Sequence, residues 1–170
     1  MKLFKNTPLT FFKFIRYKNL LLIALTQILV HYGFLKALDL PTALSDLNFF
    51  ILSLATLFIA AAGYIINDIQ DVAIDRINKP NKTFIPAPFS QNRAFNYYLV
   101  LNISGVGLGF LLSYRMGFGN FATLFVLISA LLYVYANFLK RVLLLGNLIV
   151  SVIVASAIGI VMVFDAIPVL

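Results

Sequence analysis

Five long apolar stretches alternate with polar segments, and each stretch is long enough to cross a membrane as an α-helix. A membrane-spanning helix needs about 20 mostly apolar residues. The first stretch contains His31 and Lys36, whereas the other four contain no Asp, Glu, Lys or Arg. The stretches occupy residues 20–38, 47–66, 94–114, 117–139 and 142–164. No strand is expected, because the β-branched runs lie inside stretches too long for strands. The pattern predicts one all-α domain over residues 1–170, a polytopic transmembrane bundle of about five helices.

The composition agrees with lipid as the solvent of this chain. Hydrophobic residues make up 62% of the sequence and charged residues 11%, whereas a soluble domain has roughly 25% charged residues. The basic start followed by an apolar run has the form of a secretory signal, but "HYGFLKALDLP" offers no small-residue cleavage site, so we expect a retained first helix. Zero cysteines exclude disulfides and cysteine metal sites.

The charge distribution predicts the orientation of the bundle. The net charge is +7, and all basic residues except Lys36 and Arg115 fall on one side of the predicted helices. These residues are Lys2, Lys5, Lys13, Arg16, Lys18, Arg76, Lys79, Lys82, Arg93, Lys140 and Arg141. The positive-inside bias predicts a protein of the cytoplasmic (inner) membrane, with its N-terminus and the polar loop 67–93 in the cytoplasm. Nucleic-acid binding would need a basic face on a folded polar domain, and the sequence contains no such domain.

Half of the acidic residues follow directly after the second apolar stretch, in "NDIQDVAIDRINKP". If the helix continues through Asp75, then Asp68, Asp71 and Asp75 lie on one narrow face at 100° per residue, with Asn67 beside them. Crowded carboxylates repel one another unless a cation lies between them, and hard oxygen ligands suit Mg²⁺. The pattern favours a diphosphate bound through Mg²⁺. The alternative is a solvated helix end with ordinary charges.

The remaining acidic residues are isolated in the sequence. Asp39, Asp46 and Asp165 are interpreted as scattered single charges without a shared role. His31 is expected to be an interior histidine with its hydrogen bonds satisfied, far from the Asp-rich segment. Gly105 and Gly109 have the small-xxx-small spacing that permits close packing of membrane helices.

Three sequence motifs resemble the UbiA superfamily of intramembrane prenyltransferases. "NDIQDVAIDRINKP" at 67–80 is similar to the first Asp-rich motif of that family. "IRYKN" at 15–19 resembles the entrance to its first helix, and "YVYANFLKRVLLLGN" at 133–147 resembles the junction between its fourth and fifth helices. The resemblance implies Mg²⁺-dependent transfer of a polyprenyl group from its diphosphate to a membrane-associated lipid or aromatic acceptor, in lipid or quinone biosynthesis. The segment "IDRINKPNK" leans toward members that act on geranylgeranylglyceryl phosphate.

The resemblance also implies roles for individual residues. The aspartates Asp68, Asp71 and Asp75 would be catalytic and, with Asn67, would bind Mg²⁺. The diphosphate contacts would be Asn67, Lys140, Arg141, Arg16 and Arg76. For Arg16, Lys140 and Arg141 the alternative role is anchoring at the cytoplasmic membrane surface, and for Arg76 it is counter-charge to the three aspartates. Tyr133 or Tyr135 would stabilise an allylic cation. Because these tyrosines are two residues apart on a helix, at most one is expected to face the cavity.

The sequence departs from the family pattern in two places. Lys82 stands where Arg is usual, and "NKTFIPAPFS" shifts the Pro and Gly positions of the following loop. The family usually has nine helices and a second Asp-rich motif, whereas this sequence ends at Leu170 after five stretches. We therefore expect the first part of the nine-helix fold, from a longer or truncated enzyme. The alternative is a non-catalytic membrane subunit or remnant that lacks the second motif.

Overall fold

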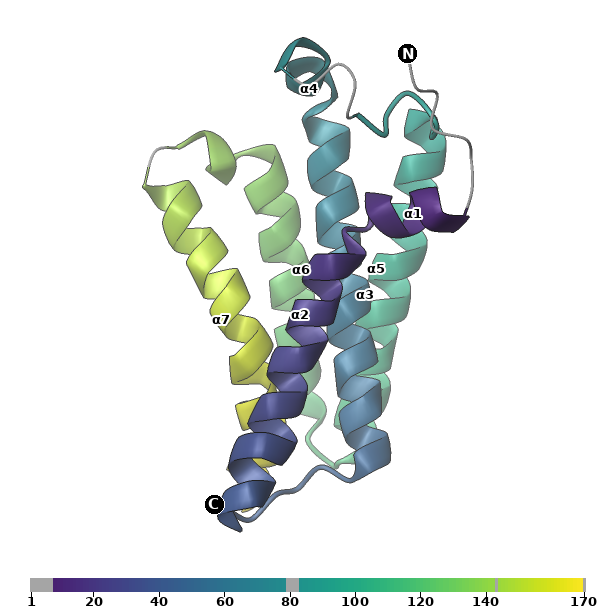
Figure 1. The fold of residues 1–170 in the computed structure, drawn as a ribbon. Coiled ribbons are helices and arrows are strands. Elements are labelled where there is room, and N and C mark those ends of the chain that lie inside the picture. Colours follow the sequence, from purple (N-terminus) through teal and green to yellow (C-terminus); the bar gives the residue numbers. More distant parts are fainter. Residues whose placement is uncertain (1–7, 79–82, 143, 170) are drawn as a thin grey trace.

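The computed structural model describes residues 8–78, 83–142 and 144–169 (Figure 1). Within these residues every regular element is helical, and five helices are long and apolar enough to cross a membrane. These spans are Tyr17–Leu38, Asp46–Gln70, Gln91–Arg115, Gly119–Asn137 and Gly146–Val169. The predicted all-α bundle of about five helices is confirmed.

The spans are built from α-helices extended by short 3₁₀ and π segments. The α-helices are α1 (Pro8–Phe14), α2 (Tyr17–Ile28), α3 (Asp46–Gln70), α4 (Val72–Asn78), α5 (Gln91–Arg115), α6 (Ala122–Asn137) and α7 (Leu145–Asp165). The first span continues beyond α2 as a π-helix, Leu29–Leu35, and a 3₁₀ turn, Lys36–Leu38. Further 3₁₀ turns are Gly119–Phe121, Leu139–Arg141 and Ile167–Val169.

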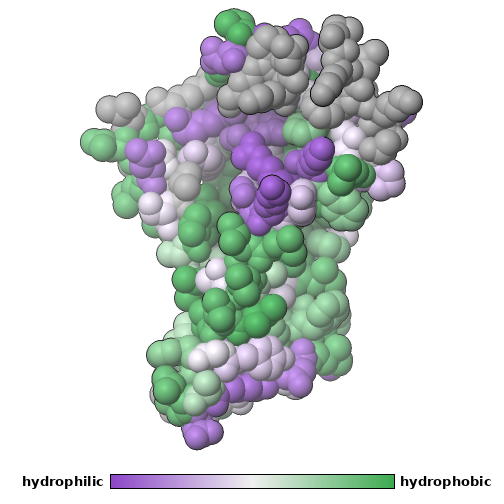
Figure 2. Space-filling view, viewed as in Figure 1, coloured by the Kyte–Doolittle hydropathy of each residue, from purple (hydrophilic) through white to green (hydrophobic). Residues whose placement is uncertain are grey.

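Helix α3 is the central helix of the bundle. In its most apolar 18-residue window 56% is buried, against 17–22% for the other four spans. Figure 1 shows α2, α5, α6 and α7 around it, with α1 and α4 at one end and the C-terminus at the other. On the face shown in Figure 2, hydrophobic residues cover the middle of the molecule and hydrophilic residues lie toward both ends. This surface matches a bilayer core between two aqueous layers.

Two serine caps fix where the long helices α3 and α5 begin. The Ser45 hydroxyl accepts a hydrogen bond from the Asn48 N–H, and the Ser90 hydroxyl accepts one from the Arg93 N–H, both at 3.3 Å. A serine at this position satisfies one of the free N–H groups of the first helical turn. Each helix therefore starts directly after its serine, slightly before the apolar stretch itself.

Close packing of α5 against its neighbours depends on two glycines. A Cβ atom at Gly105 would lie 2.8 Å from Ile59 Cγ1 and 3.0 Å from the Ala55 carbonyl oxygen. A Cβ atom at Gly109 would lie 2.3 Å from Phe125. The prediction that the small-xxx-small pair permits close packing is confirmed.

The predicted continuous helix through Asp75 is wrong in detail, because α3 ends at Gln70. Asp71 follows with φ −91° and ψ 1°, and α4 begins at Val72. The Asp71 N–H still donates to the Asn67 carbonyl oxygen at 3.0 Å, and the Asp75 N–H donates to the Asp71 carbonyl oxygen at 2.8 Å. An aspartate is a poor interior helix residue, and here one of its carboxylate oxygens binds Lys140, which lies outside the helix. The break redirects α4 away from the axis of α3 (Figure 1).

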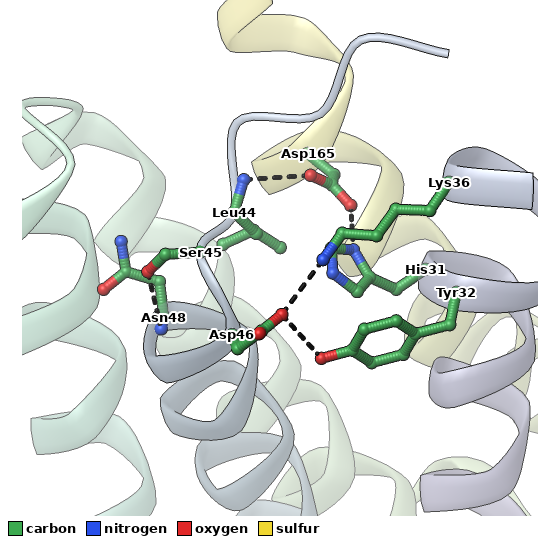
Figure 3. A network of polar contacts seen from close by, with 8 residues as sticks. All are labelled: His31, Tyr32, Lys36, Leu44, Ser45, Asp46, Asn48 and Asp165. Carbon is green, nitrogen blue, oxygen red and sulfur yellow. Dashed lines mark hydrogen bonds and ion pairs between the residues drawn. The ribbon is translucent and has the colours of Figure 1, made fainter. Parts of the chain in front are cut away.

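Asp165 was interpreted as an isolated charge, and this interpretation is wrong (Figure 3). Its side chain is fully buried, and its carboxyl group is hydrogen-bonded to His31 Nδ1 and to the Leu44 N–H at 3.0 Å. The Ala43 N–H donates to the Asp165 carbonyl oxygen at 3.0 Å. These contacts tie the end of α7 to the first span and to the segment before α3.

Asp46 also has partners, so it is not a scattered single charge either. It accepts hydrogen bonds from Lys36 Nζ and from the Tyr32 hydroxyl, both at 2.9 Å (Figure 3). Asp39 is exposed. His31 is interior, as expected, and its ring stacks on Phe49 with centroids 4.5 Å apart. Only one of its two ring nitrogens is satisfied, because Nε2 has no partner among the described residues.

Candidate functional site at the Asp-rich end

Arg16 connects α1 to α2 and points its guanidinium at the Asp-rich segment. Its Nη2 lies 2.7 Å from Asp68 Oδ1, and its guanidinium lies over the Tyr64 ring, 5.0 Å from the centroid. The Arg16 backbone is left-handed, with φ 55° and ψ 51°, which is uncommon for a residue other than glycine. Such a conformation persists where the surrounding structure holds it.

An aromatic cluster holds the chain on the N-terminal side of Arg16. The Phe14 ring stacks on Phe89, with centroids 5.0 Å apart, and meets Phe84 at 5.5 Å. Phe11 packs edge-on against Tyr97 on α5 at 5.1 Å. Phe14 and Phe89 are almost completely buried. The cluster fixes α1 against the loop before α5 and thereby fixes the position of Arg16.

Lys140 provides a second cation, which contacts Asp71. Its Nζ, on the 3₁₀ turn between α6 and α7, lies 2.6 Å from Asp71 Oδ1 and 3.3 Å from Asn67 Oδ1. The Asn67 amide donates to Asp71 Oδ2 at 3.1 Å. The Lys140 and Asp71 side chains are 12% and 23% exposed, against 43% and 17% for Arg16 and Asp68. Arg16 and Lys140, which are far apart in the sequence, therefore each bring one cation to the Asp-rich segment. Arg16 contacts Asp68, and Lys140 contacts Asp71.

The other predicted site residues are distributed more widely. Asp75 lines a small cavity of about 130 Å³ together with Arg16, Asp68 and the segment 83–85. Arg76 is exposed on α4, and no described contact brings it to the aspartates. The side chain of Arg141 lies outside the described residues, as do Lys79 and Lys82.

A larger apolar cavity of about 520 Å³ opens beside the charged groups. Arg16, Tyr64 and Asn67 line its Asp-rich end, and mostly apolar side chains of α2, α3, α6 and α7 line the rest, with Thr26, Thr56 and Ser156 among them. Tyr135 lines this cavity, whereas Tyr133 is exposed and lies near Tyr98, with ring centroids 6.4 Å apart. One tyrosine of the predicted pair therefore faces the cavity and the other does not.

Tyr64 was missed in the sequence, although a signal for it was present. It lies four residues before Asp68 on α3, and residues four apart share a helix face. Its ring carries the Arg16 guanidinium and also lines the apolar cavity. An aromatic residue one turn before an Asp-rich motif is therefore a site candidate.

Comparison with known proteins decides the family. The model of the UbiA prenyltransferase family matches residues 22–168. The chain belongs to the UbiA prenyltransferase family. This membership confirms the resemblance drawn from the three motifs, and with five apolar helices it makes the chain an integral membrane protein.

Individual relatives of this UbiA-family chain carry one common name. Digeranylgeranylglyceryl phosphate synthase of Sulfurisphaera tokodaii is 43% identical over 94 residues, which cover 55% of this chain and 32% of that protein. The synthase of the same name from Methanobrevibacter smithii is 35% identical over 116 residues, 68% of this chain and 38% of that protein. The matched part of the chain thus spans about a third of the length of these relatives.

A solved structure shares the fold. It comes from structural and mechanistic work on the biosynthesis of digeranylgeranylglyceryl phosphate synthase in membranes. It superposes with a TM-score of 0.74 at 26% identity, over 91% of this chain and 52% of that chain. The five-helix bundle is thus the arrangement found in about half of a family member.

The oxygen donors of the Asp-rich end fit Mg²⁺ by their chemistry. Asn67, Asp68, Asp71 and Asp75 offer hard oxygen ligands on consecutive turns, and Mg²⁺ commonly combines one or two carboxylates with waters and substrate phosphates. Among the described residues, no three acidic, histidine or cysteine side chains converge on one point. Asp68 turns to Arg16, and Asp71 turns to Lys140. A metal here would therefore bind to separate carboxylates and complete its coordination with water or phosphate.

Proposed function

We propose that the protein transfers a polyprenyl group from its diphosphate to a glyceryl-phosphate lipid in an Mg²⁺-dependent reaction. The observation that carries this proposal is the junction of the two ion pairs with the apolar cavity. Arg16 and Asn67 belong both to the charged site and to the cavity wall. A prenyl diphosphate has the same two parts, a polyanionic head and a long hydrocarbon chain. The shared name of the relatives favours geranylgeranylglyceryl phosphate as the acceptor.

Asn67, Asp68, Asp71 and Asp75 would hold Mg²⁺, which would supply positive charge against the diphosphate. Arg16 and Lys140 would donate hydrogen bonds to diphosphate oxygens, in place of the carboxylates they contact now. They would stabilise the negative charge that develops when the allylic C–O bond breaks. Arg76 and Arg141 remain predicted diphosphate contacts.

Aromatic faces and the exclusion of water would protect the reacting carbon. Tyr64 and Tyr135 line the cavity, and the face of an aromatic ring attracts a cation. Tyr133, the other predicted candidate, lies outside the cavity lining and is the weaker choice. The apolar walls would keep water from capturing the allylic carbon. The acceptor hydroxyl oxygen would then form the new C–O bond and lose its proton, while diphosphate leaves.

The site is proposed to face the cytoplasm from the inner membrane. Lys13, Arg16, Lys18, Arg93 and Lys140 lie on elements at the Asp-rich end. At the opposite end, the spans carry Lys36 and Arg115. The excess of basic residues at the Asp-rich end supports a cytoplasmic location under the positive-inside rule.

Binding of geranylgeranyl diphosphate to the full chain in lipid nanodiscs tests the proposal. Wild type should bind it in the presence of Mg²⁺ and lose it when EDTA is added. Asp68→Asn and Asp71→Asn should each weaken Mg²⁺-dependent binding by about 10- to 100-fold, the range of affinity lost when a group that supports a metal site is removed. The matched control is Asp46→Asn, an exposed aspartate at the opposite end, which should bind as wild type does. Unchanged binding in both Asp-rich variants would leave the chain as a non-catalytic membrane subunit.

A further inference from the structure

Three polar atoms are buried without a hydrogen-bond partner in the part of the chain that the structure describes. They are Gln27 Oε1, His31 Nε2 and Ser53 Oγ. Gln27 and His31 are 0% exposed. An unsatisfied buried donor or acceptor destabilises the folded state, so three of them in one small bundle call for a common explanation.

Helix geometry places the three residues within about one turn of one another along the bundle. The His31 ring stacks on Phe49, with centroids 4.5 Å apart, and the two helices that carry these rings run in opposite directions (Figure 1). Gln27 precedes His31 by four residues, and Ser53 follows Phe49 by four residues. Residues four apart lie one above the other on a helix face. Gln27 and Ser53 therefore lie at one level, one turn from the stacked rings toward the Asp-rich end.

The same level is the end of the apolar cavity that lies farthest from the Asp-rich segment. Thr26, Thr56 and Ile160 are the residues that line it farthest from the Asp-rich end on α2, α3 and α7. Gln27 comes directly after Thr26, and Ser53 lies one turn below Thr56. The Gln27 amide donates to the Ala157 carbonyl oxygen at 3.2 Å, so the side chain reaches from α2 to α7.

The hydrogen-bonding capacities of the three atoms are complementary to water. Gln27 Oε1 only accepts, Ser53 Oγ donates and accepts, and His31 Nε2 does either according to its protonation. His31 Nδ1 is already used by Asp165, which leaves Nε2 free to turn to a further group. A buried water typically makes about three hydrogen bonds to such groups.

We propose that Gln27, His31 and Ser53 form a water-binding polar floor that ends the apolar cavity. A hydrocarbon chain that entered the cavity would stop above this floor. To go farther it would have to displace the water and leave three polar atoms facing hydrocarbon. The water site stands by itself, whereas the limit on chain length rests on the proposed function.

A double-mutant cycle tests the shared water without any ligand. In wild type, Ser53→Ala should lower the thermal unfolding midpoint of the full chain in detergent, because the water loses a partner. In a Gln27→Leu background the water site is already lost, so removing the Ser53 hydroxyl should cause no loss or a small gain. Such dependence between two residues whose unpartnered atoms do not bond to each other is the signature of a shared partner.

Ser129→Ala is the matched control, because the Ser129 hydroxyl donates to Asn102 Oδ1 at 2.8 Å at another helix interface. Its effect should be equal in wild type and in Gln27→Leu. An equal effect of Ser53→Ala in both backgrounds would overturn the water site.

The length limit is tested by competition between prenyl diphosphates of 20 and 25 carbons. Gln27→Ala removes the side chain that closes the cavity, so relative affinity for the longer chain should rise about tenfold, the scale of added apolar contact in a pocket. An unchanged ratio would overturn the limit. If wild type binds neither compound in the presence of Mg²⁺, the proposed function fails together with the length limit. The double-mutant cycle then still decides the water site.

Discussion

Both ends of the helix bundle pair an aspartate with a basic side chain from a distant part of the sequence, but the pairs differ in burial. At the Asp-rich end, the Arg16 and Asp68 side chains are 43% and 17% exposed. At the opposite end, His31 and Asp165 are both 0% exposed. Water and ligands can reach the first pair, whereas helices enclose the second. The side chains of the first pair can therefore exchange each other for a ligand. Those of the second pair cannot, although their chemistry is similar.

The difference in burial predicts a difference in role. A partly exposed ion pair contributes little to stability, so its groups can leave each other for a substrate at small cost. Breaking a buried pair costs much more free energy, because the remaining partner stays buried without the group that compensated it. We therefore expect substitutions at the Asp-rich end to affect binding and substitutions of the His31–Asp165 pair to affect folding.

The largest expected loss of stability comes from Asp165→Ala. The substitution leaves His31 Nδ1 and the Leu44 N–H without their common partner, and breaking a buried pair typically costs about 3–5 kcal/mol. The free energy of unfolding in detergent measures the effect. Asp46→Ala, an exposed aspartate at the same end, is the control and should change it far less. If the two variants lost equal free energy of unfolding, burial would not explain the effect of Asp165→Ala.

Gly105→Ala tests whether the helix packing in the middle of the bundle is as sensitive to substitution as the buried His31–Asp165 pair. The new Cβ would lie 2.8 Å from Ile59 Cγ1 and 3.0 Å from a backbone oxygen. Overpacking of this kind costs about 1–3 kcal/mol. Gly107→Ala is the matched control on the same helix, since nothing lies within 4 Å of its Cβ position, and alanine favours a helix over glycine. The prediction fails if both variants unfold alike.

Asp71→Asn should lower the free energy of unfolding less than Asp165→Ala does, by about 1–2 kcal/mol, although its carboxylate lies 2.6 Å from Lys140 Nζ. Both side chains are partly exposed, so water can solvate the lysine that loses its partner. The same substitution should remove most Mg²⁺-dependent diphosphate binding. Measuring unfolding and binding on one preparation separates the two effects. A stability loss as large as that of Asp165→Ala would mean that the Asp-rich end is needed to hold the fold together.

Local patterns in the sequence predicted most of the bundle. Apolar stretches of about 20 residues predicted the spans, and the spacing of Gly105 and Gly109 predicted a close helix contact. The Asp-rich motif predicted the region to which Arg16 and Lys140 bring their charges. In each case the signal lies within a few turns of one helix, where side-chain periodicity is fixed by backbone geometry.

The structural features that the sequence did not predict depend on long-range contacts. His31 and Asp165 are 134 residues apart, and no local spacing relates a lone histidine to a lone aspartate. A usable signal was present, because ionisable residues inside spans are costly and usually pair with each other. The break at Asp71 also escaped prediction, since helical periodicity cannot show that a side chain binds another element.

Lys36→Ala should have the smallest effect and gives the strictest test of burial. Lys36 Nζ lies 2.9 Å from Asp46 Oδ1, as close a contact as many structural ion pairs. The two side chains are 37% and 76% exposed, so water replaces the contact when the amine is removed. The Tyr32 hydroxyl continues to bind Asp46 at 2.9 Å. The unfolding midpoint in detergent should therefore equal that of wild type within error. A clear loss would mean that proximity to Asp165, rather than burial, makes this end of the bundle sensitive.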